Sequence, residues 1–365
     1  MRVFVVFLVA CGGPTEGPPL CVRDADCVDA NPCDGDESCV DGVCEEGAVV
    51  ACAEAGEVCR VEAGAAVCDV WCDLPRPANV SMLAEDELLT FGGPGTIETA
   101  VIEAGEALES AVFATEATVG PFEAGQRVRV LARTDAEGCT EDDRFDLVYA
   151  IAEDYPGPAG GPTSEAVAID DPRIVGWAEA VHLWEVGADL TEAWMEPSRA
   201  LGEADGTAGG VLSLGRGGAV VVALDGPVAD GEGPELAVFE NGFQDDFLEL
   251  GRVSVSTDGV HFASFDGAAR TPEPVGPFDL VEPMAVHGFA GVYRQGFGAP
   301  FDLSRLRFDE AVRLGFVRLD EIRYVRIDDV VGDGTEVDAW GRPIHDPFPT
   351  VGSAGFDLDA VARLR

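Results

Sequence analysis

The feature that most constrains this chain is a dense group of cysteines near its N-terminus. Residues 21–75 carry few large apolar side chains, so this segment cannot bury a core and has to be held by covalent links. It contains no histidine, and the gaps between its cysteines are mostly longer than those of zinc knuckles, which favours disulfides over zinc. The cysteines expected in disulfides are Cys21, Cys27, Cys33, Cys39, Cys44, Cys52, Cys59, Cys68, Cys72 and Cys139.

Cys139 lies far along the chain from the other cysteines, so a disulfide to it would join two domains. A bond between Cys72 and Cys139 would clamp the cysteine-rich module to the next domain, although spacing alone does not fix the pairing. Two roles stay open for the module at 21–75. It is either a protease-resistant stalk or a partner-binding module.

The first twenty residues have the character of an export signal and a tether. Arg2 is followed by the apolar run 3–10, which is too short to span a bilayer. The run ends in Leu-Val-Ala-Cys, which resembles the bacterial lipobox and implies that Cys11 is lipidated after removal of the signal peptide 1–10. Gly12, in place of the Asp that retains such proteins at the inner membrane, favours the outer membrane or cell surface. Residues 11–20 then form a flexible tether.

The charge of the chain excludes one class of partner and favours another. The net charge is −45, from 68 acidic and 23 basic residues, and all the basic residues are arginine. Such a field repels nucleic acid and favours divalent cations. Solubility in a salty exterior is an alternative reason for the acidity.

Short apolar alternations separated by Gly, Pro and Asp predict an all-β chain. We expect a small β-sandwich spacer domain at 76–145 and a jelly-roll-like β-sandwich main domain at 146–365. Within the main domain, Asp258-Gly259 between two alternating runs predicts a hairpin, and the Gly-rich turn inside 211–224 predicts another. Asp171-Pro172 predicts the start of a helix at 173–182.

The acidic run 319–361 carries the predicted metal site. Flexible Asp/Gly loops supply the carboxylate and carbonyl oxygens that calcium takes, although the spacing is not that of an EF-hand. The alternative for each Asp is turn formation and capping. Glu240 and Asn241, just past a strand end, are further ligands, ligand-binding side chains or turn formers. The predicted metal ligands are Asp329, Asp333, Asp338, Asp357 and Asp359.

Aromatic residues in predicted loops favour a binding module over an enzyme. Rings there can stack on sugars, and Trp340 and Phe348, inside the acidic run, are the expected contacts. Core packing is the alternative for both. The four histidines are scattered, and no G-x-S-x-G elbow or H-E-x-x-H pair occurs, so we expect no catalytic activity.

Several long motifs in the C-terminal two thirds carry a family resemblance. The stretches WEVGADLTEAWMEPSRALG (184–202), LAVFENGF (236–243), VRIDDVVGDG (325–334) and PIHDPFPTVGSAGFDLDAV (343–361) resemble an uncharacterised family of bacterial "cell surface proteins". The resemblance covers about 150–365 and implies a β-sandwich similar to galactose-binding and discoidin-like modules. The N-terminal cysteine pattern resembles repeats, distantly like EGF or Dickkopf modules, of secreted myxobacterial proteins.

These observations predict an outer-membrane lipoprotein that is not an enzyme and that displays a calcium-stabilised, glycan-binding sandwich. Two alternatives remain. One is a structural or adhesive surface protein that contacts other proteins, and the other is a small-molecule capture protein, for a corrinoid or siderophore, beside an outer-membrane transporter.

Overall fold

The computed structural model describes residues 87–139, 144–151 and 156–365 without a break. Nearer the N-terminus it describes 21, 23–24, 32–33, 35, 38–40, 43–45, 47–48, 50–53, 57–72, 78–80 and 82–83. The predicted signal peptide 1–10, the tether 11–20, Cys11, Cys27 and the side chain of Cys44 lie outside the described residues.

Disulfides hold the N-terminal module together, as the sequence predicts. Two hairpins make up its regular structure, formed by β1 (Ser38–Val40) with β2 (Val43–Glu45) and by β3 (Glu57–Glu62) with β4 (Ala65–Val70). The described bonds are Cys21–Cys39, Cys33–Cys59, Cys52–Cys68 and Cys72–Cys139. The last of these confirms the predicted clamp to the following domain.

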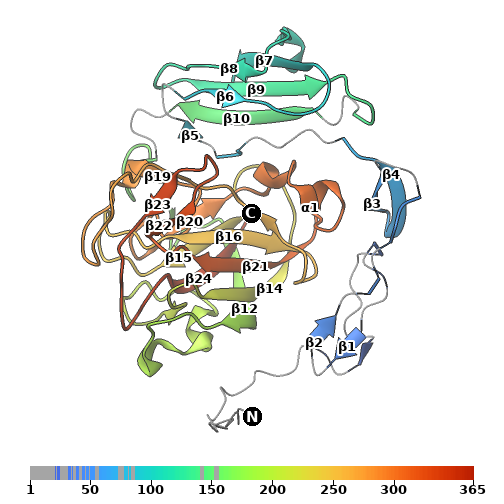
Figure 1. The fold of residues 1–365 in the computed structure, drawn as a ribbon. Coiled ribbons are helices and arrows are strands. Elements are labelled where there is room, and N and C mark those ends of the chain that lie inside the picture. Colours follow the sequence, from blue (N-terminus) through green and yellow to red (C-terminus); the bar gives the residue numbers. More distant parts are fainter. Residues whose placement is uncertain are drawn as a thin grey trace, which may run out of the picture.

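The second hairpin of the module also rests on the main domain. The amide of Val61 donates to the carbonyl of Leu314, 2.7 Å away, just after helix α1 (Glu310–Arg313). The guanidinium of Arg313 lies 4.3 Å from the ring centroid of Trp71, a cation–π distance. Figure 1 shows the module running along the side of the main domain beside α1. The module is therefore attached to both following domains.

The small β domain contains a four-stranded sheet and a two-stranded one. The order of the larger sheet is β5-β10-β9-β7, and β6 pairs with β8 in the other. Strand β9 alternates as a half-buried strand does, because Val128 and Val130 are buried in the core while Arg127 and Arg129 point the other way. The elements are β5 Met82–Leu83, β6 Leu89–Thr90, β7 Ile97–Glu103, η2 Leu108–Ser110, β8 Thr118–Val119, β9 Arg127–Thr134 and β10 Phe145–Ile151. Since β10 pairs with β9, the domain extends to residue 151 and not only to the expected boundary at 145.

The main domain contains one large curled sheet, in the order β11-β20-β15-β24-β12-β14-β21-β16-β17 with β13 also paired to β24, and two small sheets, β18-β19 and β22-β23. Its strands are β11 Val167–Ala168, β12 Ile174–Glu185, β13 Leu212–Ser213, β14 Ala219–Val228, β15 Leu236–Glu240, β16 Gly251–Ser256, β17 Ala263–Ser264, β18 Ala268–Ala269, β19 Val286–His287, β20 Phe297–Phe301, β21 Ile322–Asp329, β22 Asp333–Val337, β23 Pro343–His345 and β24 Asp357–Leu364. Besides α1, its short helices are η4 Glu192–Trp194, η5 Pro197–Ala200, η6 Pro283–Ala285 and η7 Leu303–Leu306.

Strand β12 turns the sheet into a sandwich. Its first residues pair with β24 and its later residues pair with β14, with register shifts along both pairings. Such irregularities bend a strand, so the two halves of the sheet face each other across one core. That core takes Leu236 and Val361 from one half and Val222, Val255 and Ile327 from the other. The all-β, sandwich-like prediction is confirmed.

Two local predictions in the main domain are wrong. Residues 174–185 form β12 and not a helix, because Asp171 accepts the amide of Arg173 in a turn and the chain then continues in extended pairing on both sides. The segment 211–224 is not a hairpin, because β13 pairs with β24 while β14 pairs with β12 and β21. The predicted hairpin at Asp258-Gly259 is confirmed by the pairing of β16 with β17.

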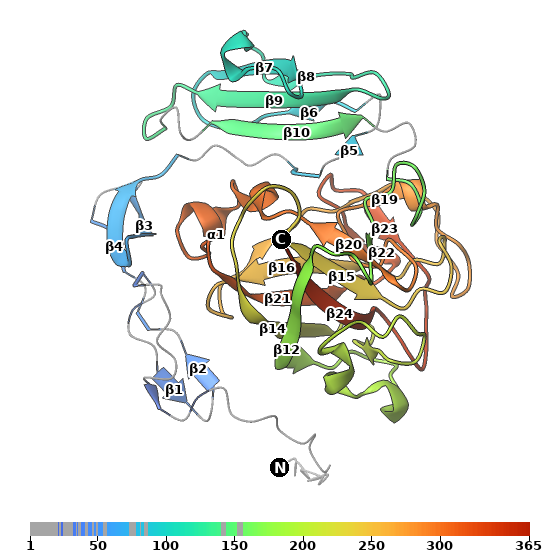
Figure 2. The same cartoon turned by 180° about the vertical axis from the view of Figure 1, so that it is seen from behind.

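The small domain sits across one end of the main domain, with β5 and β10 on the side nearest to it in both views (Figures 1 and 2). The amide of Asn79 donates to Asp266 at 2.6 Å, and the guanidinium of Arg305 donates to the carbonyl of Asn79 at 2.8 Å. The rings of Phe145 and Phe308 meet edge to face at 5.2 Å. Buried polar and aromatic contacts together therefore fix this interface.

The Cys72–Cys139 bond generates a prediction. Replacing both cysteines by Ser should destabilise the small domain by about 4 kcal/mol, because the bond closes a loop of 67 residues in the unfolded chain. Hydrogen exchange in β9 should accelerate. The matched control replaces Cys52 and Cys68, whose bond spans 16 residues inside the module, and should leave β9 unaffected. Unchanged β9 protection without the Cys72–Cys139 bond would contradict the clamp.

Candidate functional site: a buried carboxylate cluster in the main domain

Acidic side chains gather where β13, β15 and β24 meet. Ser213, at the end of β13, lies directly opposite Asp357, the first residue of β24. Glu240 ends β15, and the register shifts between Phe239 and Glu240, so a bulge re-aims the Glu240 side chain. Strand pairing therefore brings two carboxylates and a hydroxyl to one end of the sheet.

Each of these two carboxylates is held by one oxygen only. The amide of Gly242 donates to Oε2 of Glu240 at 2.7 Å, and the side-chain amide of Asn241 donates to Oδ2 of Asp357 at 3.1 Å. A Cβ at residue 242 would lie 2.8 Å from that Glu240 oxygen, so the close approach requires glycine. The second oxygens, Oε1 of Glu240 and Oδ1 of Asp357, are buried and have no hydrogen-bond partner among the described residues.

A further oxygen in this neighbourhood is buried without a partner among the described residues, Oε1 of Glu249, which lies just before β16. The hydroxyl of Ser213 is buried beside Asp357 and lowers the pKa of that carboxyl. The exposed fraction is 1% for Glu240, 2% for Asp357, 7% for Glu249 and 0% for Ser213. Water reaches these groups poorly, so a buried acceptor without a donor is costly here.

Burial shifts the protonation of all three acids in the same direction. It raises the pKa of Asp357 to about 7 and raises the pKa of Glu240 and of Glu249 well above the usual range. The negative charge of Asp357 raises the pKa of both glutamates further. Three like charges in one low-dielectric place therefore need protons or a cation.

The donor set suits a hard divalent cation. Carboxylate and hydroxyl oxygens are the ligands that calcium prefers, and donors that hold the far oxygen of each carboxylate orient the free one. The oxygens of Glu240, Glu249 and Asp357 do not all lie within 4.8 Å of one another, whereas those of Asp230, Glu235 and Asp302 do, among the described residues. Binding an ion would therefore draw the first three carboxylates together.

Two members of the tighter triad already hold backbone amides. Both oxygens of Glu235 accept amides, from Gly231 at 2.8 Å and Leu303 at 2.9 Å, and Asp302 caps η7 by accepting the amide of Ser304. Glu235 and Asp302 therefore fix the loops beside β15. The third member, Asp230, has one oxygen that is buried without a hydrogen-bond partner among the described residues, and its other oxygen lies 3.6 Å from Arg307.

The cluster has an opening. Glu249 also lines a narrow pocket with Asp346, Phe348 and Thr350, and this pocket has room for about one water-sized sphere. A small ion entering there would lie beside the carboxylates of Glu249, Asp329 and Asp346. The predicted contact residue Phe348 thus lies at the mouth of the cluster, half-buried.

The other predicted metal ligands are occupied by the protein itself. Asp329 accepts the amides of Gly217 at 2.8 Å and Phe356 at 2.7 Å, and burial raises its pKa to about 7. Asp359 accepts the amides of Asp205 and Gly206, each at 2.9 Å. These carboxylates tie strand ends to neighbouring loops, which is the structural role that the sequence left open for each Asp.

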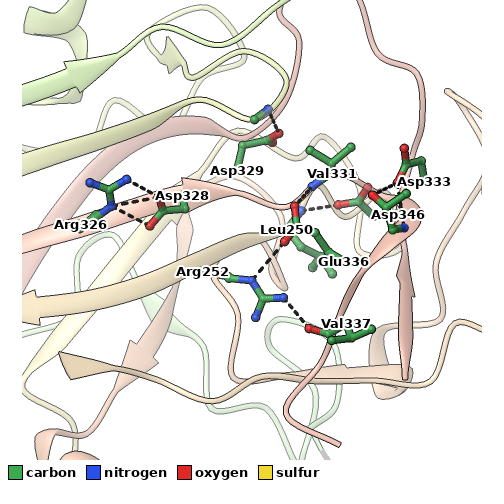
Figure 3. Close-up of polar contacts among 12 residues, drawn as sticks. Leu250, Arg252, Arg326, Asp328, Asp329, Val331, Asp333, Glu336, Val337 and Asp346 are labelled. Atoms are coloured by element: carbon green, nitrogen blue, oxygen red, sulfur yellow. Dashed lines mark hydrogen bonds and ion pairs between the residues drawn. The ribbon is translucent and has the colours of Figure 1, made fainter. Parts of the chain in front are cut away.

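Asp338 and Asp333 lie further along the run. Asp338 accepts the amides of Ala269 and Trp340 and pairs with Arg342 at 2.8 Å. Asp333 is exposed, and its hydrogen bonds from Thr335 lower its pKa. Figure 3 shows Asp329, Asp346 and Glu336 held in the same way, each by a backbone amide or an arginine. Of the five predicted ligands, only Asp357 belongs to the half-satisfied cluster.

The predicted aromatic contact Trp340 has a place inside the protein. Its side chain is partly buried and packs against the core of the small domain. The large apolar side chains that do face solvent include Phe278, which is 84% exposed, and Phe243, which is 59% exposed and stacks on Phe247 at 4.6 Å. Any ring that stacks on an external ligand is therefore more accessible at these two positions.

Comparisons with known proteins show little about this chain. No protein-family model matches it, and no curated protein matches it. Among solved structures, it is similar to a two-domain protein of unknown function from Bacteroides fragilis at 8% identity, over 80% of this chain and 93% of that one, with a TM-score of 0.23.

Sequence reasoning missed Ser213 and Glu249. In LELGRVSVS, Glu249 alternates with Leu248 and Leu250, which is the pattern of a solvent-facing residue on a half-buried strand. A serine at a strand end carries no signal of its own. What could have pointed to Glu249 is its apolar neighbourhood on both sides.

The raised pKa values predict how stability depends on pH without added metal. In EDTA, the melting temperature should fall as pH rises from about 5 to 7.5, because the folded protein holds protons that carboxylates in the unfolded chain, with a pKa of about 4, have already lost. The free energy of unfolding should fall by up to about 1.4 kcal/mol per pH unit for each group that titrates.

The double variant Glu240→Gln/Asp357→Asn is the control for that pH series. It removes two of the titrating groups and should flatten the slope. A melting temperature of the natural sequence that rises over this pH range would contradict the assignment.

Proposed function

We propose that this chain is a non-catalytic, ligand-binding surface protein, anchored by lipid at Cys11 in the outer membrane, whose main domain holds a calcium ion at Ser213, Glu240, Glu249 and Asp357. The observation that carries the proposal is the set of buried oxygens without partners on carboxylates whose other oxygens are anchored. A calcium ion supplies the positive charge that these groups lack.

The cysteine chemistry supports an extracytoplasmic location. The described residues form four disulfides, which are typical of an oxidising compartment and fit a secreted or surface protein. None of the described helices is long and apolar enough to cross a membrane. The lipid at Cys11 would then supply the attachment.

Burial argues for an ion and against catalysis at the cluster. A pair of carboxylates with raised pKa values is also what a glycosidase uses, but its acid and base must touch a glycosidic bond. Glu240 and Asp357 are 1% and 2% exposed, so a sugar polymer cannot reach them. The pocket beside Glu249, which has room for about one water-sized sphere, admits a small ion but not a sugar.

Binding to proteins is the second candidate. The exposed rings of Phe243 and Phe278 are apolar groups of the kind that protein interfaces bury. A partner protein captured in the presence of free sugars, and lost in a Phe243→Ser/Phe278→Ser variant, would favour adhesion over glycan binding.

A thermal melt tests the ion. Calcium at about 100 times its dissociation constant should stabilise the protein by about 2.7 kcal/mol relative to EDTA. Glu240→Gln and Asp357→Asn should each abolish this response. Asp359→Asn is the matched control, because Asp359 lies two residues along the same strand but both its oxygens accept amides, so the response should persist. Identical melting temperatures of the natural sequence in calcium and in EDTA would contradict the calcium site.

Lipid attachment is tested separately. When the chain is expressed with its leader in a Gram-negative host, radioactive palmitate should label it and the protein should fractionate with the outer membrane. Cys11→Ser should lose both properties, whereas Cys52→Ser/Cys68→Ser should keep the label. Failure of the natural sequence to take up palmitate would refute the anchor.

A further inference from the structure

A large cavity lies between the small β domain and the main domain. Its volume is about 1050 Å³, at the upper end of the range of small-molecule sites, about 300–1000 Å³. Strands β9 and β10 line it on one side, and the loop 163–166, Pro300 and η7 line it on the other. The position between two domains is one that ligand sites favour.

Among the described residues, the lining of this cavity has a charge opposite to that of the chain. Five arginines and three carboxylates of the described residues line it, in a protein with 68 acidic and 23 basic residues. The arginines are Arg127, Arg129, Arg173, Arg305 and Arg307. A positive, concave surface on a strongly negative molecule concentrates anions where the rest of the surface repels them.

The β9 arginines are placed by strand alternation. Arg127 and Arg129 point to the face opposite Val128 and Val130, which are in the core. Arg129 forms an ion pair with Asp146 at 2.5 Å, which uses one of the three acids of the cavity. The guanidinium of Arg127 makes no hydrogen bond or ion pair within the described part of the chain. Its positive charge acts to lower the pKa of Glu165, which burial raises.

The main-domain arginines differ in how far they are neutralised. Arg173 forms an ion pair with Asp171 at 2.8 Å. Arg305 donates to the neutral carbonyl oxygens of Asn79 and Asp266, and the negative charges of Asp266, Glu165 and Asp302 partly offset its own. The side chain of Arg307 is 59% exposed and approaches Asp230 only to 3.6 Å. A second acid of the cavity, Asp302, is engaged with the amide of Ser304.

The rest of the lining suits a ligand rich in hydroxyl groups. Asn79, Gln126, Thr163, Ser164 and Ser304 supply amides and hydroxyls, and no aromatic ring is among the described residues of the lining. A flat apolar ligand or a nucleobase would find no stacking partner there. Polar side chains around guanidinium groups match sugars that carry carboxylate or sulfate groups.

We propose that this interdomain cavity binds an anionic glycan, a short oligosaccharide with carboxylate or sulfate groups, through Arg127 and Arg307. This proposal rests on the proposed function as a ligand-binding surface protein and names its ligand class, but it does not depend on the calcium ion. Arg305 positions the two domains around the cavity through Asn79.

Calorimetric titration of the full chain tests the proposal. Trigalacturonate is the carboxylate probe, a sulfated trisaccharide is the sulfate probe, and galactotriose is the neutral control. We expect one or both anionic probes to bind, more weakly at higher salt, and Arg127→Ala and Arg307→Ala each to weaken binding about tenfold or more. Binding of one anionic probe alone supports the proposal and identifies its acidic group.

Arg323→Ala is the matched variant, because Arg323 is a half-exposed arginine paired with Glu321 outside the cavity, and binding should be unchanged. The proposal is overturned if no anionic probe binds at millimolar concentration, if galactotriose binds equally well, or if Arg127→Ala and Arg307→Ala bind as the natural sequence does. The calcium response of the melting temperature should be the same in these variants, so the titration and the melt report the two proposals separately.

Discussion

A carboxylate removed from water has to find donors, a proton or a cation, because its charge is otherwise too costly to bury. The main domain meets this constraint in two ways. Asp329, Asp338 and Asp359 give both oxygens to amides or to an arginine, and so fasten strand ends to loops. Glu240 and Asp357 give only one oxygen each. The first group completes the fold, and the second leaves acceptor capacity for something that the chain does not supply.

Much of the architecture follows from patterns that the sequence displays. The alternation in 126–133 predicts β9 with its inward valines, and cysteine density together with one distant cysteine indicates the clamp to the small domain. The same reasoning fails at 173–182, where an Asp-Pro start suggests a helix. Pairing with β14 and β24 makes that segment a strand. A local sequence signal carries no information about pairing with segments so far along the chain.

The candidate site was harder to predict for the same physical reason. Its members come from four strand ends, and Glu240 is turned into the cluster by a bulge that no composition reveals. The many acidic residues in 319–361 predict a metal site in that run, but most of these carboxylates form turns or accept backbone hydrogen bonds. What separates Asp357 from Asp359, two residues apart on one strand, is the number of amides within reach.

The Cys72–Cys139 bond has a mechanical consequence. Tension applied at a membrane-attached N-terminus would pass from residue 72 directly to residue 139 through the sulfurs, and the chain between them would lie outside the load path. Strands β6 to β9 could then not be peeled off one by one by a pull from that end. The pull would instead reach β10 and then the large sheet, so the covalent shortcut shields the earlier strands of the smaller sheet, while its last strand and the larger sheet bear the load.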